Sequence, residues 1–173
     1  MLPDNFRIAR VDRTADDVLG NLFEHYLHDM AQWFEFDTGT DGSYSYATHA
    51  IWDAYDVYFA YADSIPIGFA LIGSAAAWTD DSATRDMDEF FVIRRYRRHG
   101  VGREFANHLW NQYPGNWLVR VMQGNLPALP FWREIIAARA GGAFKEDVRT
   151  ANERVWSYFT FDSSTSSRTI ARR

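Results

Sequence analysis

Two glycines at the start of a predicted helix, directly after an arginine-rich turn, constrain this chain more than any other feature. The stretch reads Asp88-Glu89-Phe90-Phe91-Val92-Ile93-Arg94-Arg95-Tyr96-Arg97-Arg98-His99-Gly100-Val101-Gly102-Arg103, with five arginines between positions 94 and 103. Helix N-termini carry N–H groups that lack an intrahelical acceptor and a partial positive charge, and glycine lets a phosphate come close to that backbone. The sequence therefore predicts a strand–turn–helix unit that binds a pyrophosphate group.

Three other phosphate-binding or nucleic-acid-binding interpretations fit this stretch less well. A dinucleotide fingerprint needs a third glycine, and position 105 is Phe. A kinase-type phosphate loop needs a Lys followed by Ser or Thr, and this stretch has neither pair. A nucleic-acid-binding domain is expected to be basic, whereas this chain carries a net charge of -5. We therefore expect no nucleic-acid partner.

The composition indicates one soluble globular domain. The chain has 173 residues, of which 47% are hydrophobic, so it is long enough to bury a core and too apolar to be disordered. It contains no cysteine, which excludes thiol nucleophiles, thiolate zinc sites and disulfides. No apolar run approaches the roughly 20 residues of a membrane-spanning helix, and the first residues do not resemble an export signal. We therefore expect a cytoplasmic protein without a membrane partner.

The net charge conceals two halves of opposite sign. Residues 1–90 contain 4 Arg and 17 Asp or Glu, a balance of -13, and residues 91–173 contain 14 Lys or Arg and 6 acids, a balance of +8. Charged residues often do no more than solvate a surface. This division nevertheless indicates two ligands of opposite charge, one anionic and one cationic.

The hydrophobic periodicity predicts an α+β (mixed α/β) fold with one central sheet. Period-two and short apolar runs predict strands, and apolar residues three and four apart predict helices. The predicted strands lie near 6–11, 57–62, 67–74, 87–93, 117–122, 148–152 and 155–161, and the predicted helices near 16–34, 48–55, 101–113 and 128–140. This order mixes hairpins with strand–helix–strand units.

Two segments in this order resemble the GCN5-related N-acetyltransferase (GNAT) family. Residues 97–102, Arg-Arg-His-Gly-Val-Gly, resemble the family's R-x-x-G-x-G/A segment, and residues 125–132, Asn-Leu-Pro-Ala-Leu-Pro-Phe-Trp, resemble its N-x-x-A-x-x-F-Y segment. The resemblance implies a single domain over 1–162, with a central, mostly antiparallel sheet that is splayed at the coenzyme site and flanked by helices. Residues 1–56 then form the acceptor side, 57–161 the coenzyme-binding core, and 163–173 a flexible Ser- and Arg-rich tail.

The resemblance also implies a set of contacts with acetyl-coenzyme A. The main chain of Phe91 and Val92 is expected to meet the pantetheine arm, Asn125 to hold it, and Phe131 to pack beside it. The pyrophosphate is expected to lie on the segment Arg97, Arg98, His99, Gly100, Val101, Gly102 and Arg103. The basic half of the chain then corresponds to the coenzyme.

The implied reaction is direct attack of an amine on the thioester, and it needs a base. An alkylammonium group must lose a proton before it can attack, and a carboxylate near the thioester can accept that proton. Asp88 and Glu89 are the candidates. Strand alternation places Asp88 on the face of Val92 and Glu89 on the other face, but a bulge in this strand would exchange them, so both remain open as the base. The family's usual proton donor, a tyrosine, is replaced by Trp132. An indole has no acidic proton to give, so Trp132 is expected to pack in the core or on the coenzyme.

The predicted acceptor side is acidic and aromatic, which favours a small cationic acceptor. Carboxylates attract cations, and aromatic faces bind sugars and ammonium groups. The candidate acceptor-binding residues are Glu35, Asp37, Asp41, Tyr44, Tyr46 and Trp52. An aminoglycoside-type antibiotic, kasugamycin-like aminosugars included, is the favoured acceptor. Polyamines and protein amines are the alternatives, and a coenzyme-binding sensor without turnover is the alternative of a different class.

No metal is predicted. His25, His28 and Asp29 lie at helical spacings, but no further His or carboxylate completes a set of ligands. The resemblance also brings the expectation of a homodimer, because members of the family are often dimers.

Overall fold

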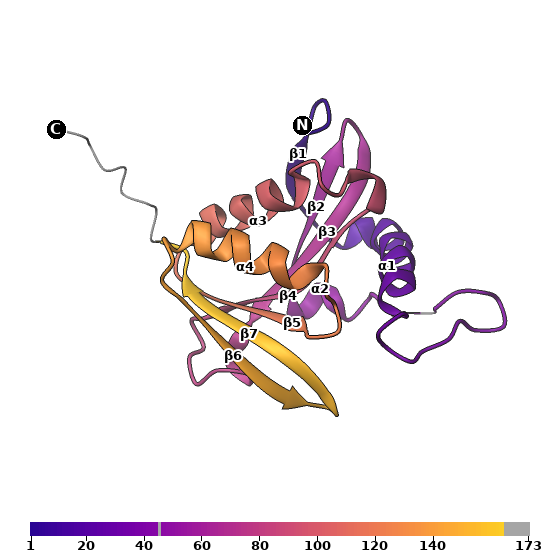
Figure 1. Cartoon of the computed structure of the whole chain (residues 1–173). Coiled ribbons are helices and arrows are strands. Elements are labelled where there is room, and N and C mark those ends of the chain that lie inside the picture. The colour runs from indigo at the N-terminus through magenta and orange to yellow at the C-terminus, as the bar shows by residue number, and fades with distance from the viewer. Residues whose placement is uncertain (45, 165–173) are drawn as a thin grey trace. The chain divides into compact units, whose positions relative to one another are not determined.

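The computed structural model describes residues 1–44 and 46–164 and contains a seven-stranded sheet (Figure 1). The strand order is β1-β2-β3-β4-β5-β7-β6. The pairs β1–β2, β2–β3, β5–β7 and β6–β7 are antiparallel, and β4–β5 is parallel. A mostly antiparallel sheet with helices is the α+β fold that the sequence predicts.

The observed elements correspond to the predicted ones. The strands are β1 (Arg7–Val11), β2 (Asp56–Ala62), β3 (Ile65–Ser74), β4 (Arg85–Val92), β5 (Asn116–Met122), β6 (Phe144–Ala151) and β7 (Arg154–Asp162). The helices are α1 (Asp16–Met30), α2 (Ile51–Ala54), α3 (Val101–Gln112) and α4 (Ala128–Arg139), and short 3-10 turns lie at Arg13–Ala15, Ala75–Ala77 and Arg94–Tyr96. The chain forms two compact units, Met1–Gly73 with Asp88–Phe105, and Ser74–Met87 with Ala106–Arg173.

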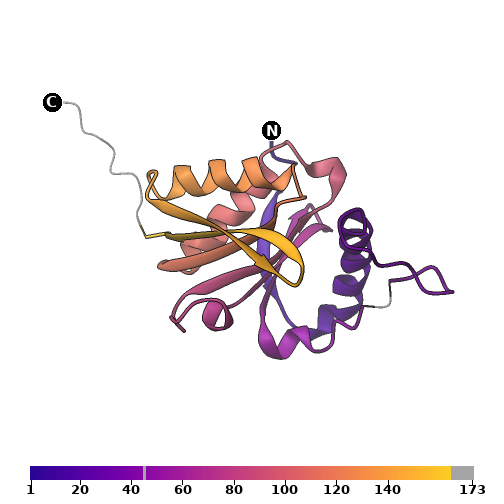
Figure 2. The ribbon, with the colours of Figure 1, turned by 60° about the horizontal axis from the view of Figure 1, so that its bottom comes forward.

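In the first unit, α1 covers β2 and β3 with an apolar stripe. Leu19, Leu22 and Phe23 of α1 are buried in one cluster with residues of β2 and β3 such as Phe59 and Phe69. Figure 2 shows α1 beside these strands, with the segment that follows it leading away from its end. The repeat of apolar residues at three- and four-residue steps places them on the side of the helix that meets the sheet.

The strands β3 and β4 approach each other very closely at Gly68. A Cβ atom on Gly68 would lie 2.3 Å from the carbonyl oxygen of Phe91, so a larger residue does not fit without moving the backbone. Two residues after Phe91, the N–H of Ile93 donates to the carbonyl of Ile67 at 2.8 Å. The end of β4 is thus fixed against β3. The parallel pairing of β4 with β5 runs from Arg85 to Met87.

The second unit is built around aromatic side chains. Trp110 of α3 has its ring centroid 5.2 Å from that of Phe161 on β7 and 6.5 Å from that of Trp132 on α4. The long β6–β7 hairpin (Figure 1) turns at Asn152 and Glu153, which both have positive φ, as a two-residue turn that follows the strand twist requires.

Several predicted boundaries differ from the observed ones. Helix α1 ends at Met30 rather than near residue 34, because the N–H groups of Trp33 and Phe34 both donate to the Met30 carbonyl and close the helix in a turn. Ser163, at the start of the predicted tail, is buried, and its N–H donates to the Gly115 carbonyl at 2.8 Å. The rest of that tail, 165–173, lies outside the described residues, as does residue 45.

Candidate active site

Residues 97–103, where the arginine-rich segment ends and α3 begins, form a cradle of backbone N–H groups. Arg98 and Gly100 have φ values of +66° and +88°, and turns of this kind present successive N–H groups to one side, where an anion can bind. The N–H of Glu104 donates to the Gly100 carbonyl at 3.0 Å. The amides of Val101, Gly102 and Arg103 therefore precede the ladder of the helix and carry its partial positive charge.

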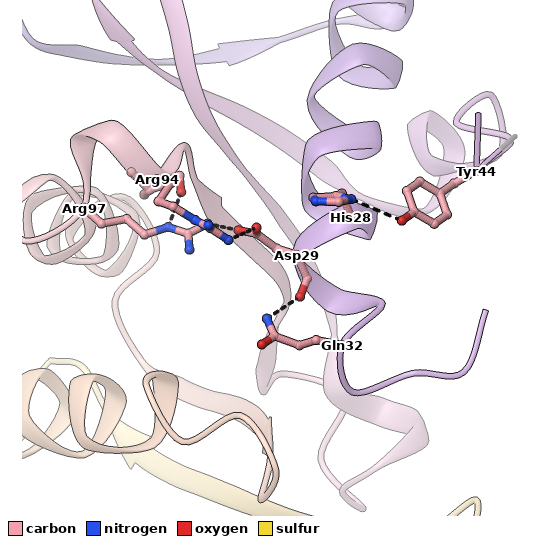
Figure 3. A network of polar contacts seen from close by, with 7 residues as sticks. His28, Asp29, Gln32, Tyr44, Arg94 and Arg97 are labelled. Carbon is pink, nitrogen blue, oxygen red and sulfur yellow. Dashed lines mark hydrogen bonds and ion pairs between the residues drawn. The ribbon is translucent and has the colours of Figure 1, made fainter. Parts of the chain in front are cut away.

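Arg97, the first residue of the cradle, directs its guanidinium toward α1. It forms an ion pair with Asp29, and its Nε donates to the Val92 carbonyl at 2.7 Å (Figure 3). Arg94 binds the other oxygen of Asp29 at 2.8 Å. The structure thus places the side chain of Arg97 against Asp29 and the end of β4, and its backbone is the first part of the cradle.

The two candidate bases lie on opposite faces of β4. Glu89 accepts a hydrogen bond from the hydroxyl of Tyr26 on α1. Phe91, two residues further on, faces the same way, with its ring centroid 5.9 Å from that of Tyr26. Phe90 faces the other way and contacts Phe105 of α3, with 5.2 Å between ring centroids. By strand alternation Asp88 shares the face of Phe90, and Glu89 is the carboxylate that faces α1.

The environment of Glu89 perturbs two tyrosines. Burial, and then the negative charge of Glu89, raise the pKa of Tyr26 well above its ordinary value, so the Tyr26 hydroxyl stays protonated and remains a donor. Burial followed by the charges of Glu89 and Asp88 also raises the pKa of Tyr46. The ring of Tyr46 stacks on Phe23 with 4.7 Å between centroids. Tyr46, a predicted acceptor-binding residue, therefore lies within the electrostatic reach of both carboxylates.

The other predicted acceptor-binding residues fall into two groups. Glu35, Asp37 and Asp41 are exposed, and Asp41 accepts hydrogen bonds from the N–H and hydroxyl of Ser43, which lower its pKa. The remaining two residues, Tyr44 and Trp52, form hydrogen bonds with residues of α1. The Tyr44 N–H donates to Glu24 at 2.9 Å.

The indole N–H of Trp52 donates to Asp16 at 2.6 Å. Asp16 lies in the first turn of α1, so this bond fixes α2 to the start of that helix. The part of the chain that follows α1 is thus bound to that helix at two places, through Tyr44 and through Trp52.

Comparison with known proteins decides the family. The profile of the acetyltransferase (GNAT) family matches residues 25–136, which includes both candidate bases and the cradle. The chain belongs to the GNAT acetyltransferase family. It is therefore an N-acetyltransferase, and acetyl-coenzyme A is its cosubstrate.

Solved structures agree with this fold at low sequence identity. The chain is similar to the ribosomal-protein-S18-alanine N-acetyltransferase from Escherichia coli, with 13% identity over 96% of this chain and 99% of the other and a TM-score of 0.62. It is similar to yncA from Salmonella typhimurium, solved with acetyl-CoA, with 14% identity over 98% and 100% and a TM-score of 0.63. A third is the PaiA N-acetyltransferase from Thermoplasma acidophilum in complex with coenzyme A, with 12% identity over 91% and 99% and a TM-score of 0.65. No curated protein sequence matches the chain.

The remaining predicted coenzyme residues of this acetyltransferase lie in its second unit. The side-chain oxygen of Asn125 accepts from the Ala128 N–H at 3.3 Å, close to the start of α4. Phe131 is half-buried, and its ring contacts that of Trp132 with 5.1 Å between centroids. Trp132 is only 6% exposed, so the indole that replaces the usual tyrosine belongs to the core.

Neither metal ligands nor a membrane-spanning helix is found in the part of the acetyltransferase that the structure describes. No group of three or more His, Asp or Glu side chains among residues 1–44 and 46–164 could hold a metal ion. None of the helices in these ranges is long and apolar enough to cross a membrane.

Sequence analysis missed two residues of the candidate site, Tyr26 and Asp29. Tyr26 is part of the apolar stripe of α1, where a tyrosine indicates a core position. Asp29 was considered only as a carboxylate near two histidines. Their spacing of three residues places both on one face of the helix. That shared face was the signal that could have found them.

Proposed function

We propose that this acetyltransferase transfers the acetyl group to the primary amine of a small polycationic acceptor, with Glu89 as the base. The hydrogen bond from Tyr26 to Glu89 carries this proposal. A hydroxyl that donates a hydrogen bond fixes the position of a carboxylate. Because the hydroxyl is neutral, the carboxylate can still accept a proton. Asp88, on the other face of β4, is the alternative base.

The coenzyme is proposed to lie on the cradle of the first unit. The positive φ values at Arg98 and Gly100 and the start of α3 fit a pyrophosphate group, because they offer backbone N–H groups together with arginine charge. Phe91 and Val92 are proposed to meet the pantetheine arm through their main chain. Asn125 and Phe131 are proposed as further pantetheine contacts, and no contact with the coenzyme is assigned to the buried Trp132.

In the proposed reaction the acceptor nitrogen attacks the thioester carbonyl carbon, the C–S bond breaks, and the coenzyme leaves as a thiolate. Glu89 accepts the proton that the acceptor ammonium must lose. The nitrogen loses a second proton as the amide forms, and this proton reaches the thiolate through water, because Trp132 has none to give and thiolates are good leaving groups.

The exposed carboxylates between α1 and α2 support a cationic acceptor. Glu35, Asp37 and Asp41 lie on the segment that follows α1, and Tyr46 of the same segment lies within the field of Glu89. Negative charge at this place attracts a polycation, and exposed aromatic rings bind sugars and ammonium groups. An aminoglycoside-type antibiotic or a kasugamycin-like aminosugar is the proposed acceptor class.

The proposal is tested by thiol release from acetyl-CoA against a panel of aminoglycosides, kasugamycin, polyamines, free amino acids and peptides with a free N-terminus or a lysine. Turnover with aminoglycosides or aminosugars, lost in Glu89→Gln and retained in the matched variant Asp88→Asn, is the expected result. A greater loss in Asp88→Asn than in Glu89→Gln assigns the base to Asp88. Turnover with the peptides alone replaces the acceptor class by a protein amine. Binding of acetyl-CoA without turnover on any amine supports a sensor instead.

A further inference from the structure

Asp29 joins the last turn of α1 to the segment that follows β4. Its two carboxylate oxygens bind two different arginines, Arg94 at 2.8 Å and Arg97 (Figure 3). The Asp29 side chain is only 14% exposed, whereas that of Arg94 is 75% exposed and that of Arg97 38%. Asp29 is therefore a nearly buried carboxylate whose better-shielded partner is Arg97.

Arg97 also binds the end of β4. Its Nε donates to the carbonyl of Val92, the last residue of β4, at 2.7 Å. Its guanidinium also lies over the ring of Phe91, 5.4 Å from the centroid. One side chain thus binds α1 through Asp29 and the end of β4 through Val92, while its own backbone begins the cradle.

The contacts of the Arg97 side chain fix the first residue of the cradle. The Nδ1 atom of His99 lies 2.8 Å from the carbonyl oxygen of Arg97, and Arg98 between them has positive φ. A backbone that turns so sharply is set by the groups that hold its ends. The side chain of Arg97 holds one end, and α3 holds the other.

We propose that Asp29 is a positioning residue for acetyl-CoA binding, because it holds Arg97 in the orientation that fixes both the end of β4 and the start of the cradle. The inference rests on the proposed coenzyme site at residues 97–103. It does not depend on the base or on the acceptor. Asp29 lies in α1, on the acceptor side. In this role, a residue of the acceptor-side helix therefore fixes the coenzyme cradle.

The sign of one measurement separates this role from a purely electrostatic one. A carboxylate near a pyrophosphate site repels the phosphates, so removing its charge without any positioning effect tightens coenzyme binding. If Asp29 positions Arg97, then Asp29→Asn weakens binding although it removes a negative charge. We expect the Kd for acetyl-CoA to rise by about tenfold.

The experiment is isothermal titration of acetyl-CoA into the full chain, without an amine. Arg94→Met is the matched control, since it removes an exposed partner of the same carboxylate, and its Kd is expected to change by less than about threefold. Arg97→Lys keeps the charge and lacks the Nε donor, so it is expected to weaken binding as Asp29→Asn does. In the double variant Asp29→Asn/Arg97→Lys the two losses of binding free energy are not expected to add, because both substitutions break the same chain of contacts.

Equal or tighter binding by Asp29→Asn overturns the proposal, and so does full additivity in the double variant. Arg97→Lys decides the question if Asp29→Asn does not fold, because wild-type affinity in that variant also overturns it. With saturating acetyl-CoA, kcat of Asp29→Asn is expected to remain near that of the wild type, while its KM for acetyl-CoA rises. If the wild type binds acetyl-CoA but acetylates no amine, the proposed acceptor fails and the Kd values still decide the role of Asp29.

Discussion

Two carboxylates three residues apart on β4 have different partners. Asp86, in the second unit, forms an ion pair with Arg120 at 2.8 Å, and its side chain is only 3% exposed. Glu89, in the first unit, accepts a hydrogen bond from the neutral hydroxyl of Tyr26 and is half-buried. The indole of Trp78 covers Arg120, whose guanidinium carbon lies 4.3 Å from the ring centroid.

The difference teaches how the charge of a partner affects a carboxylate on a strand. Proton uptake by a carboxylate in a buried ion pair leaves a guanidinium charge without compensation, so such a pair resists protonation. A hydroxyl donor has no charge of its own, so a carboxylate beside it takes up a proton without leaving a buried cation behind. Asp86 thus fits a role in holding the fold, and Glu89 fits the base that we propose.

The sharpest test of this comparison is Glu89→Gln. The amide still accepts the Tyr26 hydrogen bond but is not basic, so kcat is expected to fall by roughly 10²–10³-fold while the unfolding midpoint changes little. Steady-state thiol release and urea unfolding of the same preparation measure the two quantities. A variant that unfolds early but retains its kcat would place Glu89 with Asp86 as a structural carboxylate.

The converse change is Asp86→Ala. Removal of one partner leaves the Arg120 charge buried without its ion pair, and the free energy of unfolding is expected to fall by about 3 kcal/mol, while kcat of the folded fraction changes little. Urea unfolding measures the loss. The double variant Asp86→Leu/Arg120→Met is the control and is expected to recover most of it, because no charge is then buried. No recovery would show that the pair is not the source of the loss.

Tyr26→Phe probes the partner of Glu89 rather than Glu89 itself. Loss of a hydrogen bond to a charged group leaves the carboxylate less well placed, and kcat is expected to fall by roughly tenfold, equivalent to ~1.4 kcal/mol. Tyr61→Phe, at a half-buried tyrosine on β2, is the matched control and should retain the wild-type kcat. An unchanged kcat in Tyr26→Phe would mean that Glu89 needs no positioning by this hydroxyl.

The smallest expected effect is on stability in alkali. The pKa of Tyr26 is higher in the folded chain than in the unfolded chain, so the stability that protonated Tyr26 contributes is complete below its unfolded value, about 10, and is lost as the pH rises through the folded value. Urea unfolding at about pH 8 and about pH 11 should show a steeper loss for the wild type than for Tyr26→Phe. Tyr61→Phe should keep the wild-type slope, and equal slopes in all three proteins would contradict the assignment.

The order of the elements and the place of the cradle could be predicted from the sequence. Local patterns carry this information, because apolar periodicity and the glycines at the start of α3 depend on neighbouring residues alone. The end of α1 was placed too late, since Trp33 continues the apolar spacing although its N–H closes a turn on Met30. Periodicity reports the side chains that face the core, and it does not report where the backbone hydrogen bonds change.

The partners of the carboxylates could not be predicted. Asp88 and Glu89 were equal candidates, because alternation places them on opposite faces and a bulge in the strand would exchange those faces. Only the packing of α1 on the sheet brings Tyr26, 63 positions away, to Glu89, and places Asp29 against Arg97, 68 positions away.

The sequence by itself determined an α+β fold with one central sheet and a basic, glycine-containing cradle after one strand. The tertiary structure decided which carboxylate faces a neutral donor and which faces a cation. The physical reason is range: secondary structure and helix termini follow from contacts within a few residues, whereas the state of a carboxylate depends on groups that only folding brings near.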